Sequence, residues 1–141
     1  MTGTRPLDAV ARVRRVHEDA AARELAAAQE RARAESARAS ELLGYLHEYE
    51  AAPVRASAQW LANRTVFLGR LQEAVRAQAA RLQQAEAAVE ACRTRYMLAR
   101  QDRDVLDRLQ AGYQRAADHE ARRRAQDALD DWAGSRCRAS A

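Results

Sequence analysis

The 141-residue chain has no lysine and no isoleucine, and it has only five glycines, three histidines and two cysteines. Its five glycines are scattered, so no glycine-rich loop can cradle a phosphate. The two cysteines, Cys92 and Cys137, are too few for a disulfide framework and fit a reducing cytosol. The three histidines, His17, His47 and His119, lack metal-ligand spacing. We therefore expect no metal site and no cofactor.

Long hydrophobic runs are also missing. No apolar run approaches the ~20 residues that a membrane-spanning helix needs, and residues 1–15 lack the apolar core of a secretory signal. The formal net charge is +4, but 20 acidic residues are spread among the 24 arginines. A nucleic-acid interface concentrates its basic residues on one stripe. We expect no membrane span, no secretory signal and no nucleic-acid partner.

Most of the remaining sequence is Ala, Arg, Leu, Glu and Gln, which favour helices. Pro53 disfavours helix at the preceding residue and so marks a turn. Thr4 and Ser57 are suitable N-caps, and Gly134 is expected to end the second helix. We expect one coiled-coil domain, residues 1–141, in four segments: a helix at 6–50, a turn at 51–57, a helix at 58–133 and a tail at 134–141.

Each expected helix carries an apolar stripe at three- and four-residue steps. The first stripe comprises Leu7, Val10, Val13, Ala21, Leu25, Ala28, Ala32, Ala39, Leu42, Leu46 and Tyr49. The second runs from Trp60 to Tyr113, with heptad spacing from Leu82 and with Cys92 as a small core residue. The predicted fold class is all-α, a long antiparallel two-helix coiled-coil hairpin with a C-terminal helix overhang.

The unequal helices predict the overhang. Folding about Pro53 places Leu7 near Asp102, so the second helix extends alone beyond about Arg103. Arg103 and Gln110 interrupt the apolar stripe, which suggests that the partner helix has thinned out there. A lone helix is marginally stable in water, so we expect this end to fray or to bind a partner. A two-helix hairpin also offers no concave pocket, and we expect no catalytic residues and no enzymatic activity.

Near the turn the apolar surface is wider than one seam can hide. In the first helix it covers about 160° of the circumference at 100° per residue: Leu42, Leu43, Tyr45, Leu46 and Tyr49. The second helix has the same excess at Val66, Phe67, Leu68, Leu71, Ala74 and Val75. Some of these side chains are expected to stay exposed as a partner site. The alternative is a tightly packed tip closed by Trp60 and Tyr49.

The chain resembles the flagellar FliJ family, the small coiled-coil proteins of the bacterial flagellar type III export apparatus. The resemblance covers most of the chain. It rests on Leu42-Leu43-x-Tyr45-x-x-x-Tyr49 before the break, Asn63-Arg64, Phe67-Leu68-x-x-Leu71-x-x-Ala74, and the charged segment from Arg122 to Trp132.

The resemblance implies two binding regions and no enzymatic role. The residues that would face the cytoplasmic domain of the membrane export gate are Leu42, Tyr45, Tyr49, Phe67, Leu71, Ala74, Gln78 and Arg38. The residues that would contact the hexameric export ATPase are Arg12, Val13, Arg14, Arg15, Val16, Arg122, Arg123, Arg124, Leu129 and Trp132. The resemblance also implies export chaperones as partners and a cytoplasmic location, peripheral to the inner face of the membrane at the flagellar base.

Three other functions are compatible with the pattern. One is the equivalent stalk protein of a virulence injectisome. Another is a chaperone-like holdase hairpin for export substrates. The third is a helical arm of a larger complex, such as a nucleic-acid-binding coiled coil, which the interspersed acids argue against.

Overall fold

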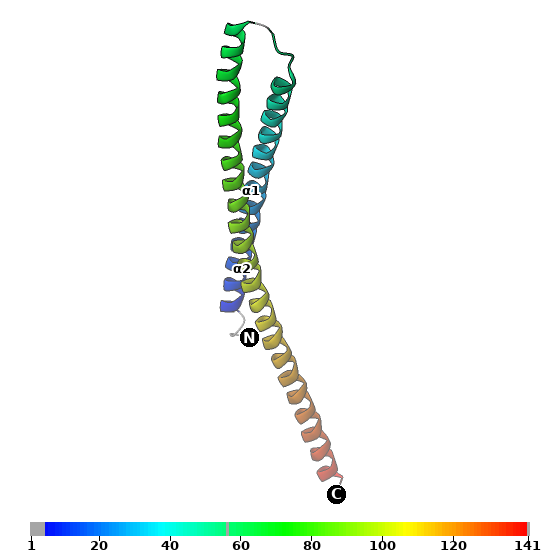
Figure 1. Cartoon of the computed structure of the whole chain (residues 1–141). Coiled ribbons are helices and arrows are strands. Elements are labelled where there is room, and N and C mark those ends of the chain that lie inside the picture. The colour runs from blue at the N-terminus through cyan, green and yellow to red at the C-terminus, as the bar shows by residue number, and fades with distance from the viewer. Residues whose placement is uncertain (1–4, 56, 141) are drawn as a thin grey trace. The chain divides into compact units, whose positions relative to one another are not determined.

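The computed structural model describes residues 5–55 and 57–140. They form two helices, α1 (Arg5–Ala51) and α2 (Ala58–Ala139), which contain 47 and 82 residues (Figure 1). The helices pack against each other as an antiparallel hairpin, so the predicted all-α fold with a longer second helix is confirmed. The expected cap Thr4 lies outside the described residues.

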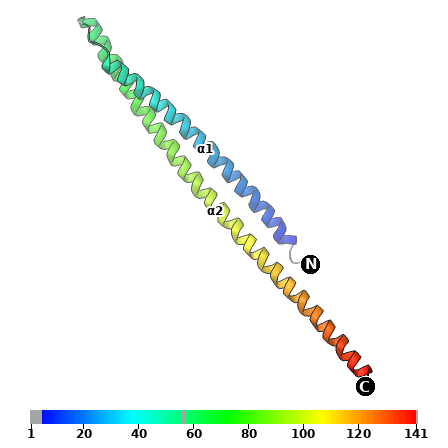
Figure 2. The ribbon, with the colours of Figure 1, turned by 90° about the vertical axis from the view of Figure 1, so that its right-hand side faces the viewer.

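Two compact units make up the chain. The tip unit is Asp19–Leu98, and the end unit is Met1–Glu18 together with Ala99–Ala141. Each unit contains a stretch of α1 beside a stretch of α2, as both views of the ribbon show (Figures 1 and 2). The expected single domain over 1–141 stays a prediction.

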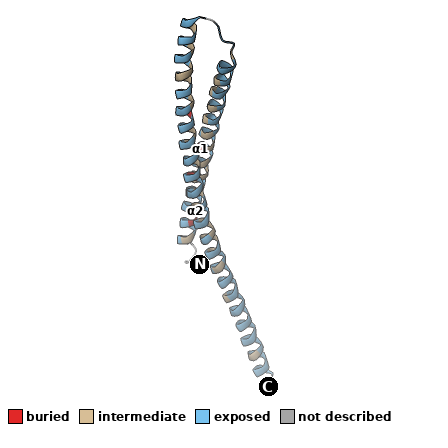
Figure 3. Ribbon diagram, viewed as in Figure 1, coloured by how far each residue is buried: buried red, intermediate tan, exposed pale blue. Residues whose placement is uncertain are grey.

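The tip unit is held by a narrow seam. Ala28 and Gln78 are 2% and 3% exposed, and Cys92 is buried as expected. The neighbouring seam positions are half-buried, and almost everything else is exposed (Figure 3). On α2 the seam alternates three- and four-residue steps, as in a coiled coil: Arg64, Leu68, Leu71, Val75, Gln78, Leu82, Ala85, Val89, Cys92 and Tyr96.

The break between the helices has one expected cap and one unexpected one. The Trp60 backbone N–H donates to Ser57 Oγ at 3.4 Å, which confirms Ser57 as the N-cap of α2. At the other side of the break, α1 has no basic residue in its last turn. Arg64 of α2 supplies one, because its Nη2 donates to the carbonyl oxygens of Tyr49 and Glu50, both at 3.0 Å.

The position of Arg64 changes the register from the expected one. The end of α1 lies beside Arg64, so the first turns of α2 extend past it. In the end unit, Arg14 rather than Leu7 meets Asp102, at 3.2 Å. The expected pairing, which took Pro53 as the centre of the fold, is wrong by about two helical turns.

The seam of the end unit is polar. Arg103 Nε lies 3.0 Å from Glu18 Oε2, and its Nη2 donates to Asp104 Oδ1 at 3.0 Å. The hydrogen bond to Asp104 and the charge of Glu18 raise the pKa of Arg103 above its ordinary value. Gln110 Nε2 donates to Asp8 Oδ1 at 3.0 Å. The expectation that α1 has thinned out here is therefore wrong.

The outer surface of α1 also differs from the expected stripe. Val10 and Val13 are 43% and 54% exposed, so neither is a core residue. The seam passes through Ala11 instead, which is buried. Ala11 lies four residues after half-buried Leu7 and seven before half-buried Glu18, so the heptad spacing continues through polar and small side chains.

The C-terminal end of α2 is longer than expected. The helix continues through Gly134 to Ala139, and no glycine among the described residues has a positive φ. Gly134 therefore does not adopt the left-handed conformation that ends a helix. Arg138 Nε donates to its carbonyl at 3.3 Å, within the helix. The expected tail at 134–141 is wrong, and the overhang begins after Gly112 rather than after Arg103, because Asp8 reaches Gln110.

Candidate functional site

Four predicted site residues flank the seam on one side of the tip unit. Each directly precedes a half-buried seam residue: Arg38 precedes Ala39, Tyr45 precedes Leu46, Phe67 precedes Leu68 and Ala74 precedes Val75. In two antiparallel helices with heptad spacing, these positions lie on the same side of the seam. We call them, with Tyr49, the tip face.

The aromatic side chains of the tip face are accessible. Tyr45, Tyr49 and Phe67 are 53%, 45% and 43% exposed. The rings of Tyr49 and Phe67 lie 4.6 Å apart between centroids and tilt by 48°, which joins α1 to α2 at the surface. The excess apolar side chains near the turn therefore remain partly in contact with water, as expected. The opposite flank carries Ser36, Leu43, Thr65 and Gln72, so the aromatic surface lies on one side only.

Three other predicted site residues belong to the seam. Leu42 and Leu71 are half-buried, and Gln78 is buried. Gln78 Nε2 donates to the Glu35 backbone carbonyl at 3.0 Å and also to the Glu35 carboxylate. Arg38 Nη1 lies 3.3 Å from the same carboxylate. Gln78 is thus occupied within the hairpin, and it connects to the tip face through Glu35 and Arg38.

A pocket beside the break has no counterpart in the sequence-based expectations. It measures about 410 Å³ and is lined by aromatic residues of both helices, by Pro53 and by two arginines. The expectation of no concave surface is wrong here, because α2 extends past the end of α1 and the loop folds back along it. The Arg64 guanidinium lies 5.4 Å from the centre of the Trp60 ring, which holds both side chains at the pocket.

The second predicted site lies in the end unit and has two separate parts. Arg12, Val13, Arg14, Arg15 and Val16 are all exposed, but five consecutive residues point around the whole circumference of a helix. Arg14 is also paired with Asp102.

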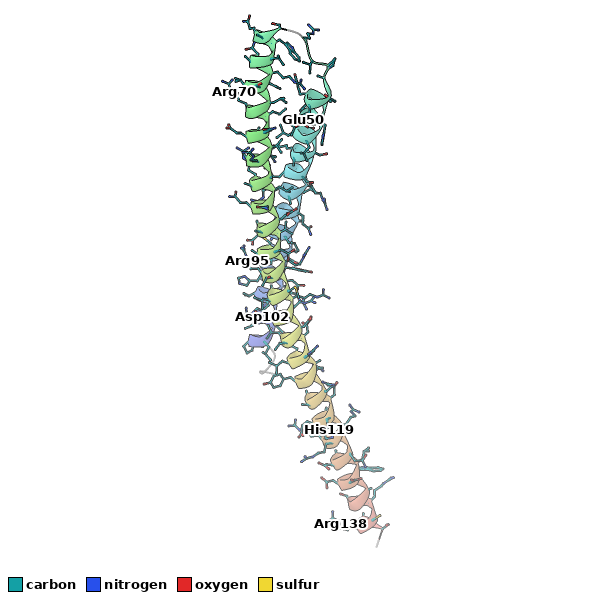
Figure 4. The ribbon with its side chains drawn as sticks, in the orientation of Figure 1. Glu50, Arg70, Arg95, Asp102, His119 and Arg138 are labelled. Carbon is teal, nitrogen blue, oxygen red and sulfur yellow. The ribbon has the colours of Figure 1, made fainter. Side chains whose placement is uncertain are left out.

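The other part lies farther along α2, on the stretch that runs past α1 between His119 and Arg138 (Figure 4). Arg122, Arg123, Arg124, Leu129 and Trp132 are exposed there. The Arg136 guanidinium lies 4.8 Å from the centre of the Trp132 ring. Because Gln110 already meets Asp8 near the start of α1, the structure does not bring these residues together with residues 12–16.

Two other properties limit the kinds of site. No helix in the described part of the chain is long and apolar enough to cross a membrane. Within residues 5–55 and 57–140, no group of three or more His, Cys, Asp or Glu side chains is placed to hold a metal ion.

Comparison with known proteins identifies the chain at the family level. The family model described as "Flagellar FliJ protein" matches residues 3–141. No curated protein and no solved structure matches. The match spans both helices of the hairpin. The chain therefore belongs to the flagellar FliJ family, whose members are non-enzymatic components of the flagellar type III protein export apparatus.

Proposed function

We propose that the protein is an adaptor that links the hexameric export ATPase to the cytoplasmic domain of the membrane export gate, and that it escorts export chaperones. The tip face would bind the gate, and the end unit would bind the ATPase. The protein would then lie in the cytoplasm, peripheral to the inner face of the membrane at the flagellar base. The flagellar family match favours this function over that of an injectisome stalk protein.

The observation that carries the proposal is the one-sided aromatic surface of the tip unit. Tyr45, Tyr49 and Phe67 leave apolar area in water on one flank, whereas the other flank is mainly polar. Tyrosine is enriched among the side chains that dominate protein–protein affinity, and phenylalanine is enriched at interfaces. Arg38 and Ala74 border this surface, and the charge of Arg38 suits the polar rim of an interface.

Tyr45→Ala tests the gate site, because Tyr45 lies outside the Tyr49–Phe67 pair and its loss leaves that packing intact. We expect the affinity for the purified gate domain to fall by about tenfold or more, since an anchoring aromatic contributes about 2 kcal/mol. Met97→Ala is the control, because Met97 is 54% exposed and belongs to neither predicted site. Calorimetry measures both.

Equal gate affinities of the two variants and the wild type would contradict the proposal. Weak capture of many unfolded export substrates, with no tight binding of the gate domain, would instead indicate a holdase. Motility of a strain that carries Tyr45→Ala gives a second readout, and we expect it to be reduced.

A further inference from the structure

The pocket beside the break combines an aromatic lining with positive charge. Tyr49, Trp60 and Phe67 form aromatic walls, and Pro53 of the loop also lines the pocket. A volume of about 410 Å³ accommodates one large apolar side chain together with its neighbours along a chain. All of these residues belong to the tip unit.

The charge of the pocket has one sign. Arg55 and Arg64 line it, and its lining contains no acidic residue. Both Arg64 hydrogen bonds to α1 leave from Nη2. A guanidinium has five N–H groups, and those on Nε and Nη1 make no hydrogen bond to the described residues. Arg55 is exposed in the loop and adds a second positive charge at the rim.

We propose that the pocket binds a segment of the export gate's cytoplasmic domain in which an aromatic or branched apolar side chain stands next to an Asp or Glu. The apolar side chain would lie between the aromatic walls. The carboxylate would accept a single hydrogen bond from Arg64 and pair with Arg55. A hydrogen bond between a guanidinium and a carboxylate is charge-assisted and stronger than one between neutral groups. This inference rests on the proposed function, since it takes the gate as the partner.

The pocket extends the tip face and is separable from it. Tyr49 and Phe67 belong to both, whereas Arg55 and Trp60 belong to the pocket alone and Tyr45 to the face alone. Variants of these last three residues therefore report on different surfaces. We expect Arg55→Glu to disturb the fold less than Trp60→Ala, because Arg55 lies exposed in the loop outside both helices.

The test measures binding of the full-length chain to the purified gate domain at low and physiological salt. We expect Arg55→Glu and Trp60→Ala each to weaken binding about tenfold. Salt should weaken the wild-type complex more steeply than the Arg55→Glu complex, because exposed charge pairs are screened. Arg70→Glu is the control, because Arg70 points from α2 to the side away from α1 (Figure 4). Circular dichroism of each variant checks the fold.

Each of the other possible results contradicts the pocket proposal, the proposed function or both. If Tyr45→Ala weakens gate binding while Arg55→Glu and Trp60→Ala do not, the pocket proposal is wrong and the proposed function stands. If the wild-type chain does not bind the gate domain, both are wrong. A loss with Trp60→Ala alone, without a salt difference, excludes the carboxylate. Self-association that both pocket variants abolish would identify a second copy of this chain as the occupant, against the proposal.

Discussion

At the scale of single residues, the hairpin depends on small and polar side chains at the seam. Ala28 is 2% exposed although its side chain is only a methyl group, so α2 approaches the backbone of α1 closely at this point. Gln78, at 3%, forms hydrogen bonds instead of apolar contacts. A single polar residue at a core position favours one register at a cost in stability. The seam of the tip unit therefore combines close approach with a polar contact that selects the alignment.

Ala28→Leu should destabilise the protein by about 1–3 kcal/mol, because the larger side chain cannot fit where the two helices approach closely. Ala27→Leu is the matched control. It lies one residue earlier on the exposed face, and leucine and alanine have similar helix propensities. Urea unfolding followed by circular dichroism compares the two variants. Equal midpoints for both would show that the helices do not approach closely at Ala28.

At the scale of the elements, one helix completes the other. α1 lacks a basic residue in its last turn, and Arg64 of α2 donates to two of its terminal carbonyl groups. Carbonyl groups in the last turn of a helix have no N–H partner within that helix. The negative end of the helix dipole also lies at the C-terminal end of α1. The contact places the end of α1 beside Arg64, so the first turns of α2 extend past it.

Arg64→Ala should lower the free energy of unfolding by about 1–2 kcal/mol, through loss of two charge-assisted hydrogen bonds near the protein surface. Arg70→Ala removes an exposed arginine from the same helix, and we expect a change within about 0.5 kcal/mol. Chemical denaturation provides both values. An Arg64→Ala midpoint equal to that of Arg70→Ala would show that this cap contributes nothing.

At the scale of the whole molecule, the two predicted binding regions belong to different units. The tip face and the pocket lie in the tip unit, and the residues expected to contact the ATPase lie in the end unit. Past Gly112, each hydrogen bond from the side chains of α2 stays within the helix, as between Gln126 and Asp130 at 3.0 Å. An exposed helix with Leu129 and Trp132 at 59% each is available to a partner.

Truncation after Tyr113 tests this division. The shortened chain keeps the Asp8–Gln110 and Glu18–Arg103 contacts, so the hairpin should remain folded. We expect binding of the purified export ATPase to be lost and binding of the gate domain to be unchanged. Trp132→Ala in the full chain should weaken ATPase binding alone. A pull-down with each partner measures both, and ATPase binding that survives the truncation would contradict the assignment.

How far the candidate site could be foreseen differs between its parts. The exposed aromatic side chains followed from counting apolar positions near the turn, because one seam cannot cover a wide stripe. The sequence did not show that Gln78 is buried in the seam while Tyr45 is exposed on the tip face. A difference of a few residues in register exchanges buried and exposed positions. The pocket was missed because it requires α2 to extend past the end of α1.

The sequence by itself determined both helices, the break at Pro53, the Ser57 cap and the burial of Cys92, because helix propensity, capping and periodicity act over a few residues. It also determined the family, through the motifs on either side of the break. Only the tertiary structure decided the register, the Arg64 cap, the polar seam at Arg103 and the continuation of α2 past Gly134. The first three depend on contacts between residues far apart in the chain. The last depends on the backbone conformation of a glycine, which the residue type leaves open.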